Sequence, residues 1–164
     1  MYRKQNGFTL IELITVIILL GILSAFAISR FPSSQSYSSA IIKNQLIASA
    51  RLAQQTSLSR ASSTANVLLT VSEILGQWNL VVSNSDALGT SYTAQVDRKS
   101  EQVRFGTNLA AACSALTAAP LVITFDGDGN RIPAQNLRIC IDSVTDIELC
   151  ISPSGYAYEG TCLP

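Results

Sequence analysis

Apolar residues form one continuous run near the start of the chain. Residues 8–31 read FTLIELITVIILLGILSAFAISRF, and no charge interrupts the part from Leu13 to Ile28. A helix over 8–31 would rise about 36 Å, enough to cross a hydrocarbon core of about 30 Å. The pattern predicts a membrane-spanning helix, with Arg3 and Lys4 keeping residues 1–7 on the cytoplasmic side.

A second, amphipathic helix is predicted over residues 32–62, as a continuation of the first. Apolar side chains recur there at the spacing of one helix face: Ile42, Leu46, Ala50 and Ala53. We expect this face to pack against a sheet. Gly21 and Pro32 are the residues that weaken helix most between the two parts.

Further along, the apolar period falls to two, which is typical of strands. The predicted strands are separated by turn residues and cover 66–71, 78–83, 91–97, 102–106, 121–126, 137–142, 147–152 and 155–158. A long helix followed by short strands in series predicts an α+β fold, with an antiparallel sheet in a head of residues 63–164. The alanine-rich segment 110–119 is expected to form a short helix or an ordered loop.

Composition and charge narrow the function. The chain has 11 basic and 11 acidic residues, and acidic residues outnumber basic ones from Asp126 onward, which argues against binding to nucleic acid. Histidine is absent, so the commonest general base and metal ligand is missing. No serine, cysteine or carboxylate has the partners that catalysis requires. We expect neither an enzyme nor a cofactor or metal site.

The segment Asp126-Gly127-Asp128-Gly129-Asn130 alternates oxygen ligands with glycine, as a calcium loop does. An EF-hand loop would need glycine and glutamate at the positions that Arg131 and Leu137 occupy. A glycine-rich turn between two strands is therefore favoured, and calcium binding is the alternative. Among the aromatic residues, Trp78 is expected in the core, and Tyr156 and Tyr158 on one face of a strand.

The cysteines all lie in the last third of the chain: Cys113, Cys140, Cys150 and Cys162. An even number without Cys-x-x-Cys spacing, in a chain that enters a membrane, indicates two disulfides in an oxidising compartment. Their connectivity is open. A turn that paired Ile141 with Leu149 would place Cys140 opposite Cys150. Cys113–Cys140 with Cys150–Cys162 is preferred, because it restrains both the alanine-rich segment and the C-terminal tail.

Glu12 separates three interpretations of the N-terminus. A signal anchor is one, and a secretory signal peptide cut after Ala27, at Ala25-Phe26-Ala27, is the second. Neither has a use for a carboxylate inside the span, which costs about 2.5–3.5 kcal/mol on insertion scales. The third interpretation, a prepilin, gives Glu12 a function.

Lys4-Gln5-Asn6-Gly7-Phe8-Thr9-Leu10-Ile11-Glu12-Leu13 resembles the processing site of type IV prepilins and type II secretion pseudopilins. The resemblance implies that a prepilin peptidase cuts between Gly7 and Phe8 and methylates Phe8. It also implies that Glu12 pairs with the N-terminal amine of a neighbouring subunit during assembly. Pilins of this kind have a glycine and a proline near Gly21 and Pro32, and the helix between them can loosen.

The head resembles the pseudopilin H and FimT/FimU type of minor pilin. The matching segments are Gly76-Gln77-Trp78, Ile123-Thr124-Phe125 and Ser154-Gly155-Tyr156, and the cysteine-bearing C-terminus is similar to minor pilins of the mannose-sensitive haemagglutinin pilus system. This resemblance implies a single-pass inner-membrane protein with a periplasmic head. Its partners would be a prepilin peptidase, the assembly platform and other pilins of a pilus or secretion pseudopilus.

Two other functions stay open at this stage. One is a tip-located binding module for DNA or a surface ligand, and the other is a secreted domain released after Ala27.

Overall fold

The computed structural model describes residues 8–28, 34–60, 65–86, 92–142 and 146–163. The chain divides into two compact units, Met1–Ser33 and Ser34–Pro164. In the first unit, the described residues form one helix, α1 (Leu10–Ile28), and the second unit is the head. Gly7 and Pro32, which the sequence singles out, lie outside the described residues.

Helix α2 (Ser34–Leu58) opens the head. It contains neither glycine nor proline, so the two residues that disfavour helix most are missing from its interior. The predicted apolar face is confirmed, because its four members are buried: Ile42, Leu46, Ala50 and Ala53. Since two of them are alanines, α2 can approach the strands closely in its second half.

The described residues of the head form two antiparallel sheets of five strands each, where the sequence predicted one sheet. The first has the order β3 (Tyr92–Asp97), β2 (Gln77–Asn84), β1 (Val67–Ile74), β6 (Leu121–Phe125) and β7 (Arg131–Ile132). The second has the order β10 (Ala157–Glu159), β9 (Ile147–Ile151), β8 (Leu137–Asp142), β4 (Gln102–Gly106) and β5 (Thr117–Ala118).

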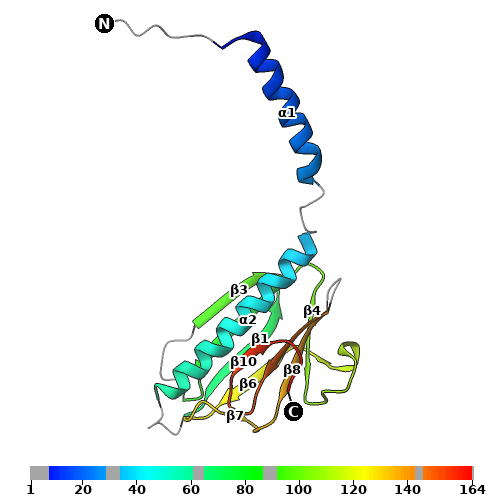
Figure 1. The fold of residues 1–164 in the computed structure, drawn as a ribbon. Coiled ribbons are helices and arrows are strands. Elements are labelled where there is room, and N and C mark those ends of the chain that lie inside the picture. Colours follow the sequence, from blue (N-terminus) through cyan, green and yellow to red (C-terminus); the bar gives the residue numbers. More distant parts are fainter. Residues whose placement is uncertain (1–7, 29–33, 61–64, 87–91, 143–145, 164) are drawn as a thin grey trace, which may run out of the picture. The chain divides into compact units, whose positions relative to one another are not determined.

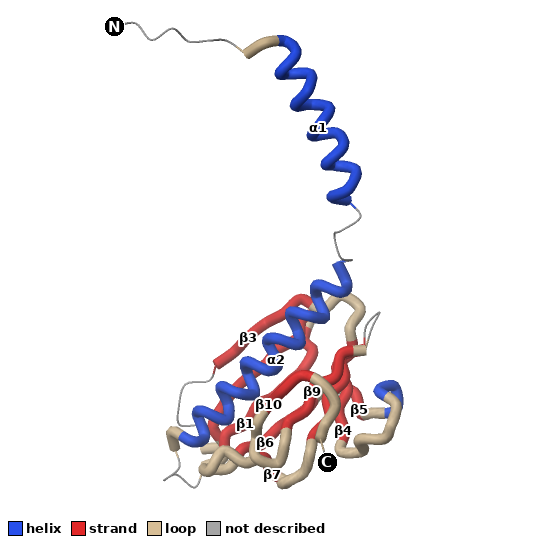
Figure 2. Tube along the Cα trace, in the orientation of Figure 1, coloured by secondary structure: helices blue, strands red, loops and turns tan. Residues whose placement is uncertain are grey.

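Helix α2 packs against strands of both sheets, and the main core lies beneath it (Figure 1). In β1 burial alternates, with Val67, Leu69 and Val71 inward. Figure 2 shows α2 lying over the strands of the head. The α+β class predicted from the sequence is therefore confirmed, with one helix covering an antiparallel β structure.

Strand β8 is buried on both of its faces from Leu137 to Ile141, in contrast to the alternating burial of β1 and β6. Leu137, Ile139 and Ile141 belong to the main core, whereas Cys140 lies in a second cluster with Cys113 and Leu116. Those two residues come from the alanine-rich segment, which forms the short 3-10 turn η1 (Cys113–Ala115) and β5. The segment thus covers the outer face of β8.

Strand boundaries differ from the prediction at short elements. Strand β1 extends to Ile74, and the predicted strand 155–158 is replaced by β10, because residues 152–156 form a turn closed by the Gly155 N–H on the Ser152 carbonyl. Strands β5 and β7 have two residues each and were not predicted. Two residues are too few to show a period.

Two turns meet at the C-terminal end of α2, and glycine is required there. Gly155 has φ +78°, and a Cβ on it would lie 2.1 Å from the Gly129 carbonyl oxygen. The Gln54 side chain of α2 donates to the Ser154 carbonyl at 2.7 Å and to the Gly129 carbonyl at 3.4 Å. The segment Ser154-Gly155-Tyr156 therefore has a packing role.

The β1–β2 hairpin is closed by two residues, Leu75 and Gly76, between paired Ile74 and Gln77. Both have positive φ, 53° and 76°, as type I′ turns require. Glycine and asparagine adopt this conformation readily, whereas for leucine it costs about 1–2 kcal/mol. Leu75 is 98% exposed, so it gains no compensating burial within the chain.

Candidate functional site

The N-terminal end of α1 is built by Thr9 and Glu12. The Thr9 backbone N–H and hydroxyl both donate to Oε2 of Glu12 at 2.9 Å, and the Glu12 N–H donates to the Thr9 hydroxyl oxygen at 3.3 Å. This reciprocal arrangement is a capping box, in which each side chain satisfies a backbone group of the other. The signal Thr9-x-x-Glu12 is visible in the sequence, but it was not predicted there, because Glu12 was interpreted only as an assembly residue.

The described side chains of the first unit, residues 8–24, are all exposed, and most of them are apolar. Phe8, which the sequence predicts to become the N-terminal residue, is 89% exposed. Gly21 lies inside α1 with no atom within 4 Å of the position of a Cβ. An apolar surface of this extent on one helix requires a cover of lipid or protein.

None of the helices among the described residues is both long enough and apolar enough to cross a membrane. The predicted span, 8–31, includes residues 29–31, which lie outside the described part.

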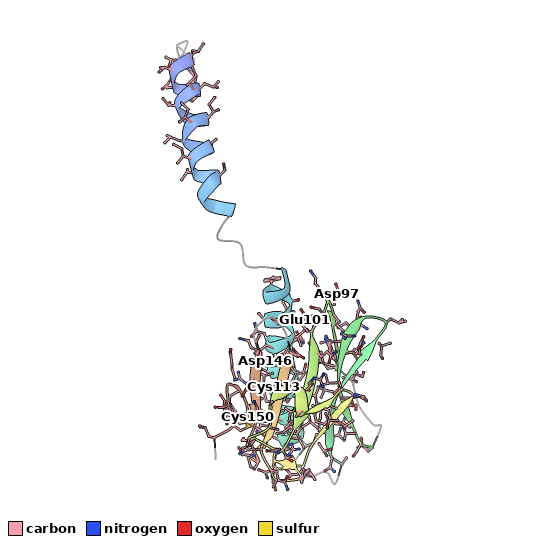
Figure 3. All side chains as sticks on the ribbon, turned by 90° about the vertical axis from the view of Figure 1, so that its right-hand side faces the viewer. Asp97, Glu101, Cys113, Asp146 and Cys150 are labelled. Atoms are coloured by element: carbon pink, nitrogen blue, oxygen red, sulfur yellow. A yellow bond between two sulfur atoms is a disulfide. The ribbon has the colours of Figure 1, made fainter. Side chains whose placement is uncertain are left out.

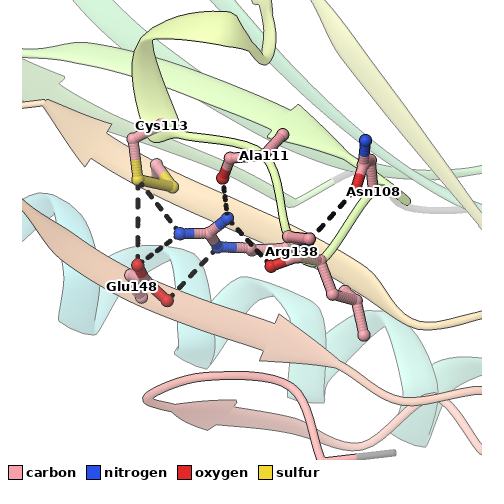
Figure 4. Close-up of polar contacts among 8 residues, drawn as sticks. Asn108, Ala111, Cys113, Arg138 and Glu148 are labelled. Carbon is pink, nitrogen blue, oxygen red and sulfur yellow. Dashed lines mark hydrogen bonds and ion pairs between the residues drawn. A yellow bond between two sulfur atoms is a disulfide. The ribbon is translucent and has the colours of Figure 1, made fainter.

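In the head, a guanidinium group joins three segments (Figure 4). Arg138 on β8 forms an ion pair with Glu148 on β9 and donates to the carbonyl oxygens of Ala111 and Leu109, the latter at 3.3 Å. Its Nη2 also lies 3.6 Å from the Cys113 sulfur. Arg138 is buried, so these partners replace the water that its charge has lost.

One group of described side chains has the spacing of a metal-ligand set. The ligand atoms of Cys113, Cys140 and Glu148 lie within 4.8 Å of one another. Both sulfurs are joined in a disulfide, however, and the carboxylate is paired with Arg138. A metal ion would need thiolates and a free carboxylate, so these residues fit a structural cluster better than a metal site.

The structure contains the disulfides Cys113–Cys140 and Cys150–Cys162, the connectivity preferred from the sequence. The register of β8 and β9 is not the alternative one, in which Ile141 pairs with Leu149 and Cys140 lies opposite Cys150. Ile141 pairs with Ile147, and Cys140 therefore lies opposite Glu148, while Cys150 lies opposite Arg138. A cross-strand bridge between Cys140 and Cys150 is excluded by this register.

The turn at Asp126 uses its carboxylate internally. Oδ1 of Asp126 accepts the N–H groups of Asp128 at 3.0 Å and Asn130 at 2.8 Å, and the Asp126 N–H donates to the Asn130 carbonyl. The turn connects β6 to β7, and Gly129 supplies a φ of +77°. This geometry matches the glycine-rich turn that the sequence favoured over calcium binding.

A buried carboxylate fastens the start of α2 to the β3–β4 loop. Glu101 is fully buried, and it accepts hydrogen bonds from the Ser38 hydroxyl and from the Lys99 and Ser100 N–H groups. Burial by itself raises the pKa of Glu101, but the bonds from Ser38 and from the backbone together hold this pKa below its ordinary value. Figure 3 shows Glu101 and Asp97 at the end of the head where α2 begins.

An open groove of about 620 Å³ lies beside the C-terminal tail. Tyr156 and Tyr158 stack along it with ring centroids 6.1 Å apart, and Arg51 lies 5.4 Å from the Tyr156 ring centre. The polar groups around it already have partners in the chain: the Tyr158 hydroxyl accepts the Leu163 N–H, and Asn136 donates to the Leu163 carbonyl. Among the residues that the structure describes, the groove therefore shows no unsatisfied group aimed at a ligand.

The other aromatic residues divide between core and surface. Trp78 is buried, as expected, and the Arg98 guanidinium lies 5.9 Å from its ring centre. Tyr92 is exposed on the edge strand β3.

An apolar helix with an acidic cap at its start, joined to a disulfide-bonded head of one helix on antiparallel sheets, is the arrangement of a pilin-like protein. Residues 2–28 match the prokaryotic N-terminal methylation motif. Residues 44–155 match the family described as type II transport protein GspH. Because this match covers more than half of the chain, the protein belongs to the GspH family, within the type IV pilins and pseudopilins.

Among solved structures, the chain is similar to the type IV minor pilin FimU of Pseudomonas aeruginosa. The two are 15% identical, the alignment covers 76% of this chain and 91% of that chain, and the TM-score is 0.49. Comparison with curated proteins gives no match.

Proposed function

We propose that the chain is the precursor of a minor pilin or pseudopilin. A prepilin peptidase cuts it between Gly7 and Phe8 and methylates Phe8, and the mature chain then enters a pilus or a secretion pseudopilus or primes its assembly. The observation that carries the proposal is the Glu12 carboxylate at the start of a helix whose described side chains are apolar and exposed. Family membership and the N-terminal methylation motif support it.

Before assembly, residues 8–31 lie in the inner membrane as a single span. Arg3 and Lys4 stay in the cytoplasm, in keeping with the orientation that flanking positive charges impose. The head then lies in the periplasm, a compartment in which its two disulfides can form and persist. The partners at this stage are the peptidase and the inner-membrane assembly platform.

The capping box leaves one carboxylate oxygen of Glu12 available to a neighbouring subunit. Both bonds from Thr9 go to Oε2, so Oε1 can accept a bond from another group. The cut after Gly7 creates a cationic amine at Phe8. In a filament, the amine of one subunit and the Glu12 carboxylate of the next form a pair that sets the register, because an unpaired buried charge is strongly disfavoured.

The intact mass of the membrane-extracted protein tests processing. Loss of residues 1–7 with the gain of one methyl group is the expected result. Loss of residues 1–27 would instead show release after Ala27 as a secreted domain, and it would overturn the proposal. An unprocessed chain would leave a plain signal anchor.

A pair of glycine variants locates the cut. Gly7→Leu places a bulky side chain at the bond that the peptidase must reach, so the precursor should accumulate. Gly21→Ala changes the other glycine of this segment, where a Cβ meets no atom, and should be processed normally. Equal processing of both variants would contradict the assignment of the cut to Gly7.

The alternatives receive less support from the head. DNA binding at a pilus tip is disfavoured by the excess of acidic residues after Asp126, and salt-sensitive binding of DNA by the protein would reverse that judgement. For a surface ligand, the tyrosine groove is the strongest candidate, but its polar groups are engaged within the chain. We assign the head a structural role and no catalytic one.

A further inference from the structure

The turn between β1 and β2 presents apolar side chains to solvent in a strained conformation. Leu75 has positive φ and is 98% exposed, and Ile74 beside it is 55% exposed. The turn type favours glycine, asparagine or aspartate at the position of Leu75. A residue that opposes both the backbone conformation and the solvent is a sign of a contact made outside the isolated head.

A chain of hydrogen bonds connects this turn to the first turns of α2. The Arg98 N–H donates to the Gly76 carbonyl at 3.0 Å, and the Arg98 side chain donates to the Glu101 carbonyl at 3.0 Å. Glu101 in turn accepts the hydroxyl of Ser38. The leucine turn, residues 74–77, therefore lies at the end of the head at which α2 begins.

This end of the head follows the proposed membrane span directly in the chain. The proposed span ends at residue 31, and α2 begins at Ser34. The same end of α2 also exposes Tyr37, at 66%, and an amphipathic aromatic ring of this kind favours the membrane interface.

The charges at this end offset one another. Glu73 is paired with Arg98, Asp97 accepts a bond from the Gln77 side chain at 2.9 Å, Glu101 is buried, and Lys99 is exposed. The described part of this surface thus has neither a cationic cluster for anionic lipids nor an unpaired acidic one that would repel them. The attraction that these described residues offer to a bilayer is therefore apolar.

We infer that the leucine turn rests in the interface of the membrane before assembly, with Leu75 and Ile74 inserted among the upper acyl chains and Tyr37 at the headgroups. The inference depends on the membrane anchoring proposed above. It gives the head a membrane attachment of its own. Amphipathic helices that lie in this interface bury their apolar face about 5–10 Å into the boundary between headgroups and acyl chains.

Three tryptophan variants of the full chain in phosphatidylcholine vesicles test the contact. Leu19→Trp reports insertion of α1, Leu75→Trp reports the turn, and Leu58→Trp, at the opposite end of α2 about 36 Å from its start, is the matched exposed control. Lipids brominated near the top of the acyl chain quench tryptophan on contact. The buried Trp78 gives the same background in all three variants.

We expect the brominated lipids to quench the fluorescence of the tryptophans introduced at positions 19 and 75. The tryptophan at position 58 should not be quenched. Loss of quenching at position 19 would mean that the membrane anchoring itself is wrong. Quenching at 19 without quenching at 75 would overturn only the inference about the turn. Quenching at 75 that requires phosphatidylglycerol would also contradict it, since the contact would then be electrostatic.

A second variant separates membrane contact from a role in folding. Leu75→Asn supplies a residue that the turn prefers, so the thermal midpoint of the head should stay unchanged or rise. With Tyr37→Trp as reporter, the same change should reduce quenching by the brominated lipids. A lower midpoint would assign Leu75 to folding instead, and unchanged quenching would contradict the contact. If the leucine turn is shielded only in assembled filaments, its contact is with a neighbouring subunit, and the membrane contact is contradicted.

Discussion

Thr9 and Glu12 hold each other at the start of α1: the hydroxyl and the N–H of Thr9 both donate to one carboxylate oxygen of Glu12, at 2.9 Å. Glu12 therefore has two physical roles, as the cap of its own helix and as the anion proposed to meet a neighbouring amine. Replacement by alanine removes both, so it cannot separate them.

Glu12→Gln should separate capping from charge. Glutamine accepts the same bonds in a capping box, so the helix start is retained, but the anion is lost. We expect normal processing and poor incorporation, measured as the share of processed protein in sheared filaments. Thr9→Ala, which removes the cap at a cost of about 1 kcal/mol and keeps the carboxylate, should be incorporated. If Glu12→Gln enters filaments as well as the wild type, the pairing argument is wrong.

Glu101 should make the stability of the head sensitive to acid. Its folded-state pKa lies below the ordinary value of 4.5, so the ionised group stabilises the fold above that pH, and this contribution is lost as the pH falls through the folded-state pKa. Glu101→Gln should flatten the dependence below pH 4.5. At neutral pH it should lower the free energy of unfolding by about 1–3 kcal/mol, because glutamine offers one acceptor oxygen for three donors.

Chemical unfolding of the detergent-solubilised chain at several pH values provides the measurement for Glu101. Asp128→Asn is the matched control, since Asp128 is exposed, and its effect should stay within about 0.5 kcal/mol. An unchanged pH profile for Glu101→Gln would show that the buried carboxylate does not govern acid stability.

The destabilisation caused by replacing Glu148 should be smaller when Arg138 is replaced as well. Glu148→Leu leaves a buried guanidinium without its anion and should destabilise by up to about 3 kcal/mol. The double change Arg138→Met with Glu148→Leu removes both charges and should cost less than the sum of the single changes. A double-mutant cycle on the free energy of unfolding measures this coupling, and additive effects would contradict it.

The two disulfides should stabilise the fold by different amounts, because they close loops of different length. Their sequence separations are 27 for Cys113–Cys140 and 12 for Cys150–Cys162. The loop-entropy model predicts about 0.7 kcal/mol more stabilisation from the longer loop. Paired Cys→Ala variants, compared by urea unfolding, test the order. The reverse order would show that contacts in the native state outweigh the entropy of the unfolded chain.

Gly155→Ala should be far more harmful than Gly76→Ala. Both glycines have positive φ, 78° and 76°, so the conformational cost of alanine, about 1–2 kcal/mol, is common to both. At Gly155 the added Cβ also meets the Gly129 carbonyl at 2.1 Å, whereas at Gly76 it meets no atom within 4 Å. The difference between the two thermal midpoints isolates the clash. Equal midpoints would contradict the close approach of the two turns.

Local chemistry explains why the apolar face of α2 and most strands could be predicted. Ile42 and Ala53 fall on one face because the helical period determines which residues line up, and the period needs only the sequence. The capping box at Thr9 and Glu12 is equally local. It was missed because an acidic residue in a predicted span was interpreted through its charge alone.

Long-range contacts explain what could not be predicted. Ser38 and Glu101 stand far apart in the sequence, and so do Ala111 and Arg138, and no pattern along the chain brings them together. The division into two sheets and the two-residue strands β5 and β7 depend on the same contacts. So does the register that places Cys140 opposite Glu148, since a shift of two residues keeps the alternation of a strand intact.

The sequence by itself determined the family, the apolar N-terminal helix with its single acid, and the α+β class, because motifs, hydropathy and periods are properties of neighbouring residues. Only the tertiary structure decided which polar groups are buried together and that a strained leucine lies beside the start of α2. Those relationships arise only when the chain packs, because they depend on the combined free energy of contacts between residues that are far apart in the sequence.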